Sequence, residues 1–184
     1  MFRRCRLIAL ILVATFSAVP VAYGTDNWYF AGRGGYVSDS GFGVAGAIGR
    51  QWVWPAPYAA NIRGELEIAL RRNETDNSAI GYVSTLPEMA NVYYDFHTTV
   101  PELFPFVGAG WGVLSADNGN DTDQAASYQG IVGIRWRIHR STFMTAEYRY
   151  VTAPGLNFQV GNSGTSAPTN YTTHNLFLGV GFKF

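Results

Sequence analysis

The sequence of 184 residues has little cysteine and little charge. Its single cysteine is Cys5, so no disulfide can form within the chain, and the fold must be stabilised without crosslinks. Charged residues make up 14% of the chain, where about a quarter is usual for a globular domain. Acidic and basic residues are equal in number. No excess of positive charge therefore points to nucleic acid as a partner.

Long apolar runs are also missing. The run LIALILVATFSAV (7–19) is too short to span a bilayer as a helix. It follows a short basic head and precedes Ala22 and Gly24, small residues that are typical of a cleavage site. We therefore predict a secretory signal peptide over residues 1–24, with a short membrane anchor as the alternative, and one domain over 25–184. Removal of the signal would also remove Cys5 and leave a net charge of −3 on the mature chain.

Aromatic residues and glycine, in contrast, are abundant: aromatics make up 15% of the chain and glycine occurs 21 times. In the predicted mature chain, apolar residues recur at every second position, which is the period of a β-strand with one apolar face. The stretch NIRGELEIALRR is the clearest case, because Ile62, Leu66, Ile68 and Leu70 alternate with polar or small residues. Composition and spacing together predict an all-β protein.

Eight alternating segments are separated by turn-rich stretches. They cover residues 27–37, 41–54, 61–72, 87–96, 103–115, 127–138, 143–151 and 174–184. Segments of about 9 to 13 residues match the length that a tilted strand needs to cross a bilayer. The connectors at one end are mostly longer than those at the other, as in membrane barrels. The sequence therefore predicts an eight-stranded antiparallel up-and-down transmembrane β-barrel, with 153–172 as its main external loop.

The charged residues of these segments lie on the face opposite the apolar one. Alternation alone also fits a soluble β-sandwich or a lipocalin-like barrel. Glycines such as Gly108, Gly110 and Gly179 share the polar face, and the narrow interior of a small barrel needs small residues among large ones. We therefore predict a network of paired charges in the lumen of a membrane barrel. Its members are Arg33, Arg63, Glu65, Glu67, Arg71, Asp95, Arg135, Arg137, Glu147 and Arg149.

Four stretches carry a resemblance to a known family. NWYFAGRGGYV, PFVGAGWGV, TAEYRYV and the terminal LGVGFKF together resemble strands of the small outer-membrane β-barrel family, which includes the OmpA transmembrane domain and OmpX/Ail-like proteins. The resemblance implies the outer membrane of a Gram-negative cell, delivery by periplasmic chaperones and insertion by the barrel-assembly machinery. It implies that Phe182 and Phe184 form the assembly signal. It also implies contact with lipopolysaccharide, whose phosphates Arg71 and Arg72 could bind.

Catalytic and metal-binding patterns are weak. His139 and Ser141 precede Glu147, the residue types of lipid A deacylases, but the residues that follow Ser141 differ from that enzyme pattern. The three histidines His97, His139 and His174 are not clustered, and the acidic loop 116–124 lacks the register of an EF-hand. We therefore expect no catalytic residues, no metal site and no cofactor.

The sequence favours a non-enzymatic outer-membrane surface protein that supports the membrane and presents loops to a host or environmental ligand. A narrow channel for small solutes is the alternative, and a lipid A-modifying enzyme is the third hypothesis. Nothing follows Phe184 in the sequence, so we expect no periplasmic peptidoglycan-binding domain.

Overall fold

Eight strands make up the computed structural model, which describes residues 28–38, 41–53, 61–74, 82–117, 122–159 and 166–184. The predicted signal peptide lies outside these residues. Among the described residues, no helix is long and apolar enough to cross a bilayer. The strands are β1 (Trp28–Val37), β2 (Gly41–Val53), β3 (Asn61–Glu74), β4 (Tyr82–Asp95), β5 (Leu103–Asp117), β6 (Thr122–Arg137), β7 (Thr142–Gln159) and β8 (Ser166–Lys183).

Each strand pairs with its neighbours in chain order, and β8 returns to pair with β1, so the sheet closes into a barrel. All pairs are antiparallel, and the closing pair runs from Tyr29 opposite Lys183 to Val37 opposite Asn175. The amide of Phe184 adds a hydrogen bond of 3.0 Å to the carbonyl of Trp28. The prediction of an eight-stranded antiparallel barrel is confirmed.

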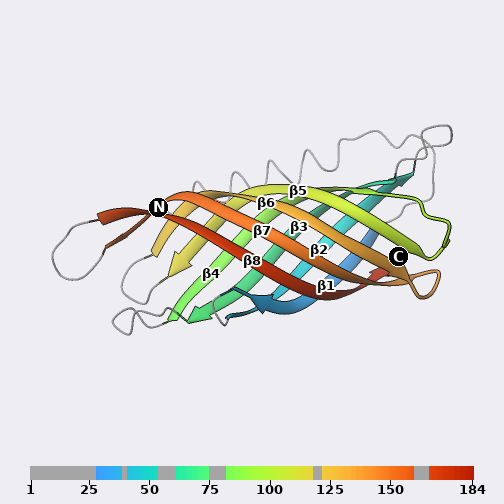
Figure 1. The fold of residues 1–184 in the computed structure, drawn as a ribbon, viewed down its shortest axis with the longest axis horizontal. Helices are drawn as coiled ribbons and strands as arrows, with labels where there is room; N and C mark the ends of the chain where they lie inside the picture. Colours follow the sequence, from blue (N-terminus) through green and yellow to red (C-terminus); the bar gives the residue numbers. More distant parts are fainter. Residues whose placement is uncertain (1–27, 39–40, 54–60, 75–81, 118–121, 160–165) are drawn as a thin grey trace.

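The strands are strongly tilted, as Figure 1 shows. The C-terminus lies at one end, beside the β4–β5 and β6–β7 turns, and the β7–β8 hairpin extends from the opposite end (Figure 1). We call the first of these ends the C-terminal mouth.

Side chains alternate between the two faces as the sequence predicted. On β3, Arg63, Glu65 and Glu67 are buried inside, whereas Ile68 and Leu70 are exposed outside. The interior is tightly filled: a Cβ on Gly49 would lie 2.3 Å from the Tyr29 ring, and one on Gly181 would lie 2.1 Å from the Phe143 ring. The glycines of the inner face therefore make room for aromatic side chains.

The predicted loop over residues 153–172 is largely wrong. β7 continues to Gln159 and β8 begins at Ser166, with Leu156 opposite Thr169 and a register shift between Ala153 and Leu156. The stretch is rich in residues typical of turns, but antiparallel pairing satisfies its backbone groups along most of its length. The barrel wall thus extends into a long hairpin on this side.

Candidate functional site

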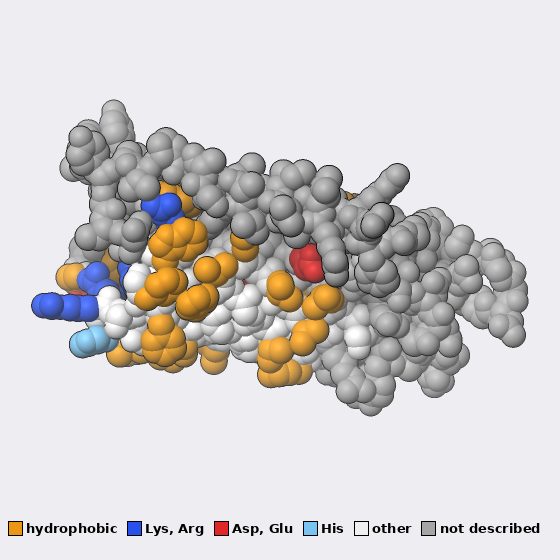
Figure 2. Space-filling view, turned by 180° about the vertical axis from the view of Figure 1, so that it is seen from behind, with side chains coloured by type: hydrophobic (Ala, Val, Ile, Leu, Met, Phe, Trp, Pro, Cys, Tyr) orange, Lys and Arg blue, Asp and Glu red, His pale blue; other side chains and the backbone are white. Residues whose placement is uncertain are grey.

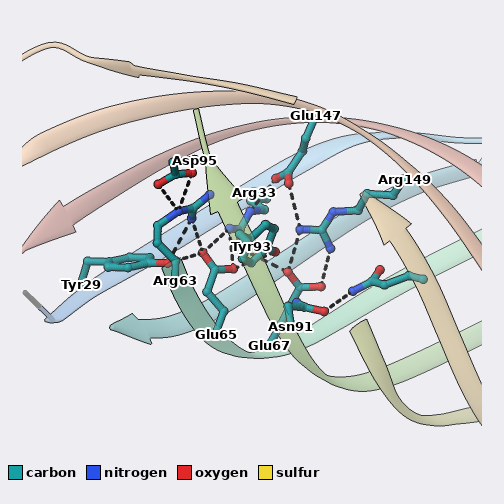
Figure 3. A network of polar contacts seen from close by, with 11 residues as sticks. Tyr29, Arg33, Arg63, Glu65, Glu67, Asn91, Tyr93, Asp95, Glu147 and Arg149 are labelled. Atoms are coloured by element: carbon teal, nitrogen blue, oxygen red, sulfur yellow. Dashed lines mark hydrogen bonds and ion pairs between the residues drawn. The ribbon is translucent and has the colours of Figure 1, made fainter. Parts of the chain in front are cut away.

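The charges on the inner face meet in one network in the lumen (Figure 3). Side chains from β1, β3, β4, β6 and β7 contribute to it, because the inward positions of separate strands come together once the barrel is closed. Each ionic side chain in it is at most 4% exposed. The ionic members are Arg33, Arg63, Arg135, Arg149, Glu65, Glu67, Asp95 and Glu147.

Glu65 is the most highly bonded of these acids. The hydroxyl of Tyr29 donates to its Oε1 at 2.7 Å, and that of Tyr93 donates to its Oε2 at 3.1 Å. Arg33 Nη2 donates to both oxygens, at 2.8 and 2.6 Å, and Arg63 Nη1 donates to Oε1 at 3.2 Å. Two neutral and two charged donors therefore compensate the desolvation of this carboxylate.

A second group of charges lies beside it and is linked through Arg33. Arg149 donates to the two oxygens of Glu67 at 2.5 and 2.9 Å and to Glu147 at 3.2 Å. Arg33 forms ion pairs with the same two acids, at 3.2 Å to Glu67 and 2.6 Å to Glu147. The fork of Arg149 on Glu67 is bidentate, which is the strong geometry for an arginine and a carboxylate.

A third group lies on the side of the C-terminal mouth. Arg63 Nε donates to both oxygens of Asp95, at 3.0 and 2.9 Å, and Arg135 Nη2 pairs with the same carboxylate at 2.7 Å. The Arg63 guanidinium also lies 4.4 Å from the ring centre of Tyr93 and 5.0 Å from that of Phe106. Asp95 therefore carries two arginines and is the link between the network and the mouth.

The network has four basic and four acidic members, so it is electrically balanced. Burial of any one of these ions without a partner would cost several kcal/mol. Balanced and mutually bonded, the side chains fill the lumen with fixed polar groups that solvent barely reaches. This arrangement suits a structural plug, since its acids are all held by arginines.

Two predicted members lie apart from the network. Arg137 ends β6 and is exposed at the mouth, where its Nη2 donates to the carbonyl of Pro101 at 2.7 Å. The prediction that Arg137 belongs to the lumen network is wrong, because this last residue of β6 lies beyond the enclosed part of the lumen. Arg71 is enclosed at 2% exposure near the hydroxyl of Tyr171 and the charges of Glu67 and Arg149, but none of its guanidinium nitrogens forms a hydrogen bond of regular geometry with a described residue.

The burial of Arg71 also removes one of the two expected contacts with lipopolysaccharide. A side chain inside the barrel does not reach the lipid that surrounds the barrel, so the expected contact of Arg71 with lipopolysaccharide is wrong. The side chain of Arg72 lies outside the described residues, and its contact remains a prediction.

The residues of the deacylase pattern are not assembled into a catalytic group. His139 and Ser141 are exposed in the β6–β7 turn, whereas the carboxylate of Glu147 is held by Arg33 and Arg149 in the lumen. In the described part of the chain, no group of three or more His, Cys, Asp or Glu residues is placed to hold a metal ion. Residues 118–121 of the acidic loop lie outside that part.

Sequence reasoning missed the hydroxyl of Tyr29 and the amide pair inside the barrel. Gln129 Nε2 of β6 donates to Asn91 Oδ1 of β4 at 2.6 Å, over Gly110 of the intervening strand β5. The inward phase of each strand could have placed these residues on the inner face. Their partners could not be found in this way, because partners depend on the stagger between strands.

Phe182 and Phe184, the predicted assembly signal, lie on the outer face at the end of the chain, and both are exposed. The ring of Phe184 stacks on that of Phe30 with 4.9 Å between centres. The final residue is therefore packed on β1, across the closing pair.

The outer face of the barrel is apolar. Large side chains are exposed along it, with Leu178 at 67% and Leu176 at 59%, and Figure 2 shows hydrophobic side chains along the barrel wall. An exposed apolar outer face around a sheet with a polar, ionic interior is unfavourable in water but favourable in the hydrocarbon of a bilayer. The closed sheet also leaves no unpaired strand edge for lipid to contact.

Comparison with known proteins gives matches to sequence and fold. A sequence profile described as "outer membrane protein beta-barrel domain" matches residues 8–184. A search of curated protein sequences returned no match.

Solved structures of similar fold include Neisserial surface protein A, with a TM-score of 0.58, 18% identity, and 86% of this chain and 97% of that chain covered. The N-terminal β-barrel domain of Pseudomonas aeruginosa OprF has a TM-score of 0.53 at 15% identity, and the match covers 88% of this chain and 100% of that chain. The outer membrane enzyme PagL has a TM-score of 0.52 at 14% identity, and the match covers 85% of this chain and 99% of that chain. At these identities the likeness concerns the fold alone.

Proposed function

Because this chain belongs to the outer membrane protein β-barrel domain family, we propose that it is a non-enzymatic surface protein of the outer membrane. Its barrel stabilises the membrane and carries surface segments, chiefly 153–172, that contact host or environmental ligands. Lipid and lipopolysaccharide surround it, with Arg72 on lipopolysaccharide phosphates, and the barrel-assembly machinery inserts it after reading Phe182 and Phe184.

The balanced network in the lumen carries this proposal. A channel needs a continuous path for water, but four arginines and four carboxylates occupy the lumen and hold one another at 2.5–3.2 Å. Barrels of eight strands have interiors that side chains can fill. A structural role therefore fits better than solute passage.

The placement of chemical groups supports a non-enzymatic role. The acids of the lumen are bonded to arginines and so are not free to activate a nucleophile. Ser141 lies in an exposed turn, and its carbonyl accepts a hydrogen bond of 2.7 Å from the amide of Lys183. The β7–β8 hairpin, in contrast, projects from the barrel and offers a surface to a ligand (Figure 1).

Planar-bilayer recordings test the sealed lumen. We expect no stable conductance steps from the wild-type protein and new steps from the Glu67→Ala/Arg149→Ala double variant, which removes a central bonded pair. That variant is the positive control, because it opens space without adding net charge. Steps of similar size from both proteins would favour the channel hypothesis.

A shortened hairpin tests the surface role. Residues 157–168 are replaced by Asn-Gly, which suits a two-residue turn and keeps Leu156 opposite Thr169. We expect the variant to insert and to maintain resistance of the cells to detergents, but to lose binding to host cells or matrix. Equal binding by both proteins would contradict loop presentation. Release of fatty acid from lipid A by the wild-type protein but not by Ser141→Ala would instead favour the enzyme hypothesis.

A further inference from the structure

A cavity of about 510 Å³ opens at the C-terminal mouth of the barrel. It is lined from β2, β3, β5, β6, β7 and β8 and from the two turns beside the C-terminus, and its volume is in the range of about 300–1,000 Å³ that small-molecule sites have. Figure 2 shows Lys, Arg and His side chains gathered at this end of the barrel, on the left of the view. Among the network members described above, Arg135 lines this cavity.

Positive charge dominates this cavity. Arg135, Arg137, Arg140 and Lys183 line it together with His97 and His139, and no Asp or Glu is among its described lining residues. The carboxylate of Asp95 pairs with Arg135, but it is shared between Arg63 and Arg135. Lys183 Nζ donates to the neutral amide oxygen of Gln51 at 2.9 Å, so its charge is not compensated by that contact.

The deepest of these cations has hydrogen-bonding capacity left over. Arg135 is 4% exposed and its Nη2 pairs with Asp95, but its Nη1 has no hydrogen-bond partner among the described residues. A buried donor without a partner costs free energy. A ligand oxygen in the cavity that Arg135 lines would satisfy this nitrogen.

Aromatic rings fix the guanidinium groups in place. Arg135 lies 5.2 Å from the ring centre of Phe104 and 5.6 Å from that of Phe143, and Arg137 lies 5.4 Å from Phe104. Such stacking reduces the entropy that the side chains lose when a ligand binds. The site is therefore partly preorganised.

We propose that this cavity, at the C-terminal mouth of the barrel, binds a small molecule that carries several negatively charged phosphate groups. The cations come from β6, β8 and the β6–β7 turn, and a tetrahedral phosphate offers acceptor oxygens in several directions at once, whereas a carboxylate offers two in one plane. Arginine forks match phosphate geometry. This inference does not depend on the surface role proposed above.

Isothermal titration with inorganic pyrophosphate tests the site on the full protein in zwitterionic detergent. We expect saturable binding that weakens with added salt, and weaker binding of citrate. The double variant Arg137→Gln/Arg140→Gln removes two exposed cations outside the lumen network, so the barrel should still fold, and we expect at least a tenfold loss of affinity. Arg50→Gln is the control, because Arg50 lies on the other face of β2 from Gln51, beside the rings of Trp28 and Trp52.

Nanodiscs distinguish a lipid headgroup from a soluble phosphate. If the phosphate comes from lipid, pyrophosphate will bind more weakly in discs of phosphatidylglycerol than in discs of phosphatidylcholine, and mass spectrometry will find phosphatidylglycerol retained by the wild type but not by the double variant. If it comes from solution, affinity will be the same in both discs. The proposal is overturned if pyrophosphate does not bind, if citrate binds equally well, or if the double variant and Arg50→Gln behave alike.

Discussion

Glu65→Gln probes the network at its most highly bonded acid. The change keeps the shape of the side chain, removes its charge, and turns one oxygen into an NH₂ group that faces donors from tyrosine and arginine. Arg63 then retains one acidic partner among the described residues, Asp95, which already pairs with Arg135, together with a hydrogen bond to the hydroxyl of Tyr29. We expect the free energy of unfolding to fall by about 3–5 kcal/mol, the usual cost of leaving a buried ion without its partner.

Unfolding by urea from phospholipid vesicles measures this change, since the chain contains five tryptophans whose fluorescence reports the transition. Glu102→Gln removes an acid of the exposed β4–β5 turn and serves as the control, with an expected change within about 0.5 kcal/mol. A Glu65→Gln protein as stable as this control would refute the energetic role of the network.

A compensating variant makes the same test sharper. Adding Arg63→Gln to Glu65→Gln leaves Arg135 with Asp95, and leaves Arg33 and Arg149 with the two remaining glutamates, so every ion keeps a partner. We expect the double variant to be less destabilised than the sum of the two single variants, by about 0.5–3 kcal/mol. Strict additivity would show that these charges are not energetically coupled.

Three further substitutions test other features. Arg71→Met replaces an enclosed cation that forms no ion pair and no hydrogen bond of regular geometry with the described residues, and should raise the free energy of unfolding by about 1–4 kcal/mol in the same urea assay. A lower value would show that the nearby Tyr171 and Glu67 compensate its charge. Gly35→Ala would place a Cβ 1.9 Å from the carbonyl oxygen of Leu176 in the closing pair, and should lower the free energy of unfolding by about 3 kcal/mol. The loss should appear as lost heat-modifiable mobility on unboiled gels. Gly46→Ala is the control and should fold normally, because its Cβ would meet no described atom within 4 Å. Glu88→Leu removes an exposed acid of β4 and should stabilise the barrel by about 1 kcal/mol in vesicles but not in detergent; equal effects in both would argue against a lipid-facing position.

The architecture and the two faces could be predicted from the sequence. Alternation in 61–72 placed Arg63, Glu65 and Glu67 on one face, and burial agrees with it. This worked because the period of a strand is fixed by backbone geometry and needs no knowledge of neighbouring strands.

The pairing of charges could not be predicted in the same way. Glu67 and Arg149 are 82 residues apart, and they meet only because of the stagger between strands, which alternation does not encode. The same limit explains Arg71, which was correctly expected on the inner face but forms no ion pair with the described members of the network. The strand content of 153–172 was missed because turn-forming residue types were given more weight than pairing.

The closing pair of β1 with β8 has a consequence for how the molecule reaches its native state. Its two strands come from opposite ends of the domain, and some of the ion pairs inside, such as Glu67 with Arg149, also join strands that are far apart in the chain. An open sheet could therefore form the pair of Arg63 with Asp95 between the neighbouring strands β3 and β4, but not the pair of Glu67 with Arg149 between β3 and β7. The pairs between remote strands form only when the barrel closes, so closure and completion of the network are coupled. Separation of β1 from β8 within the bilayer would break the pairs that depend on closure and expose their charges to lipid. We therefore expect the inserted barrel to open slowly.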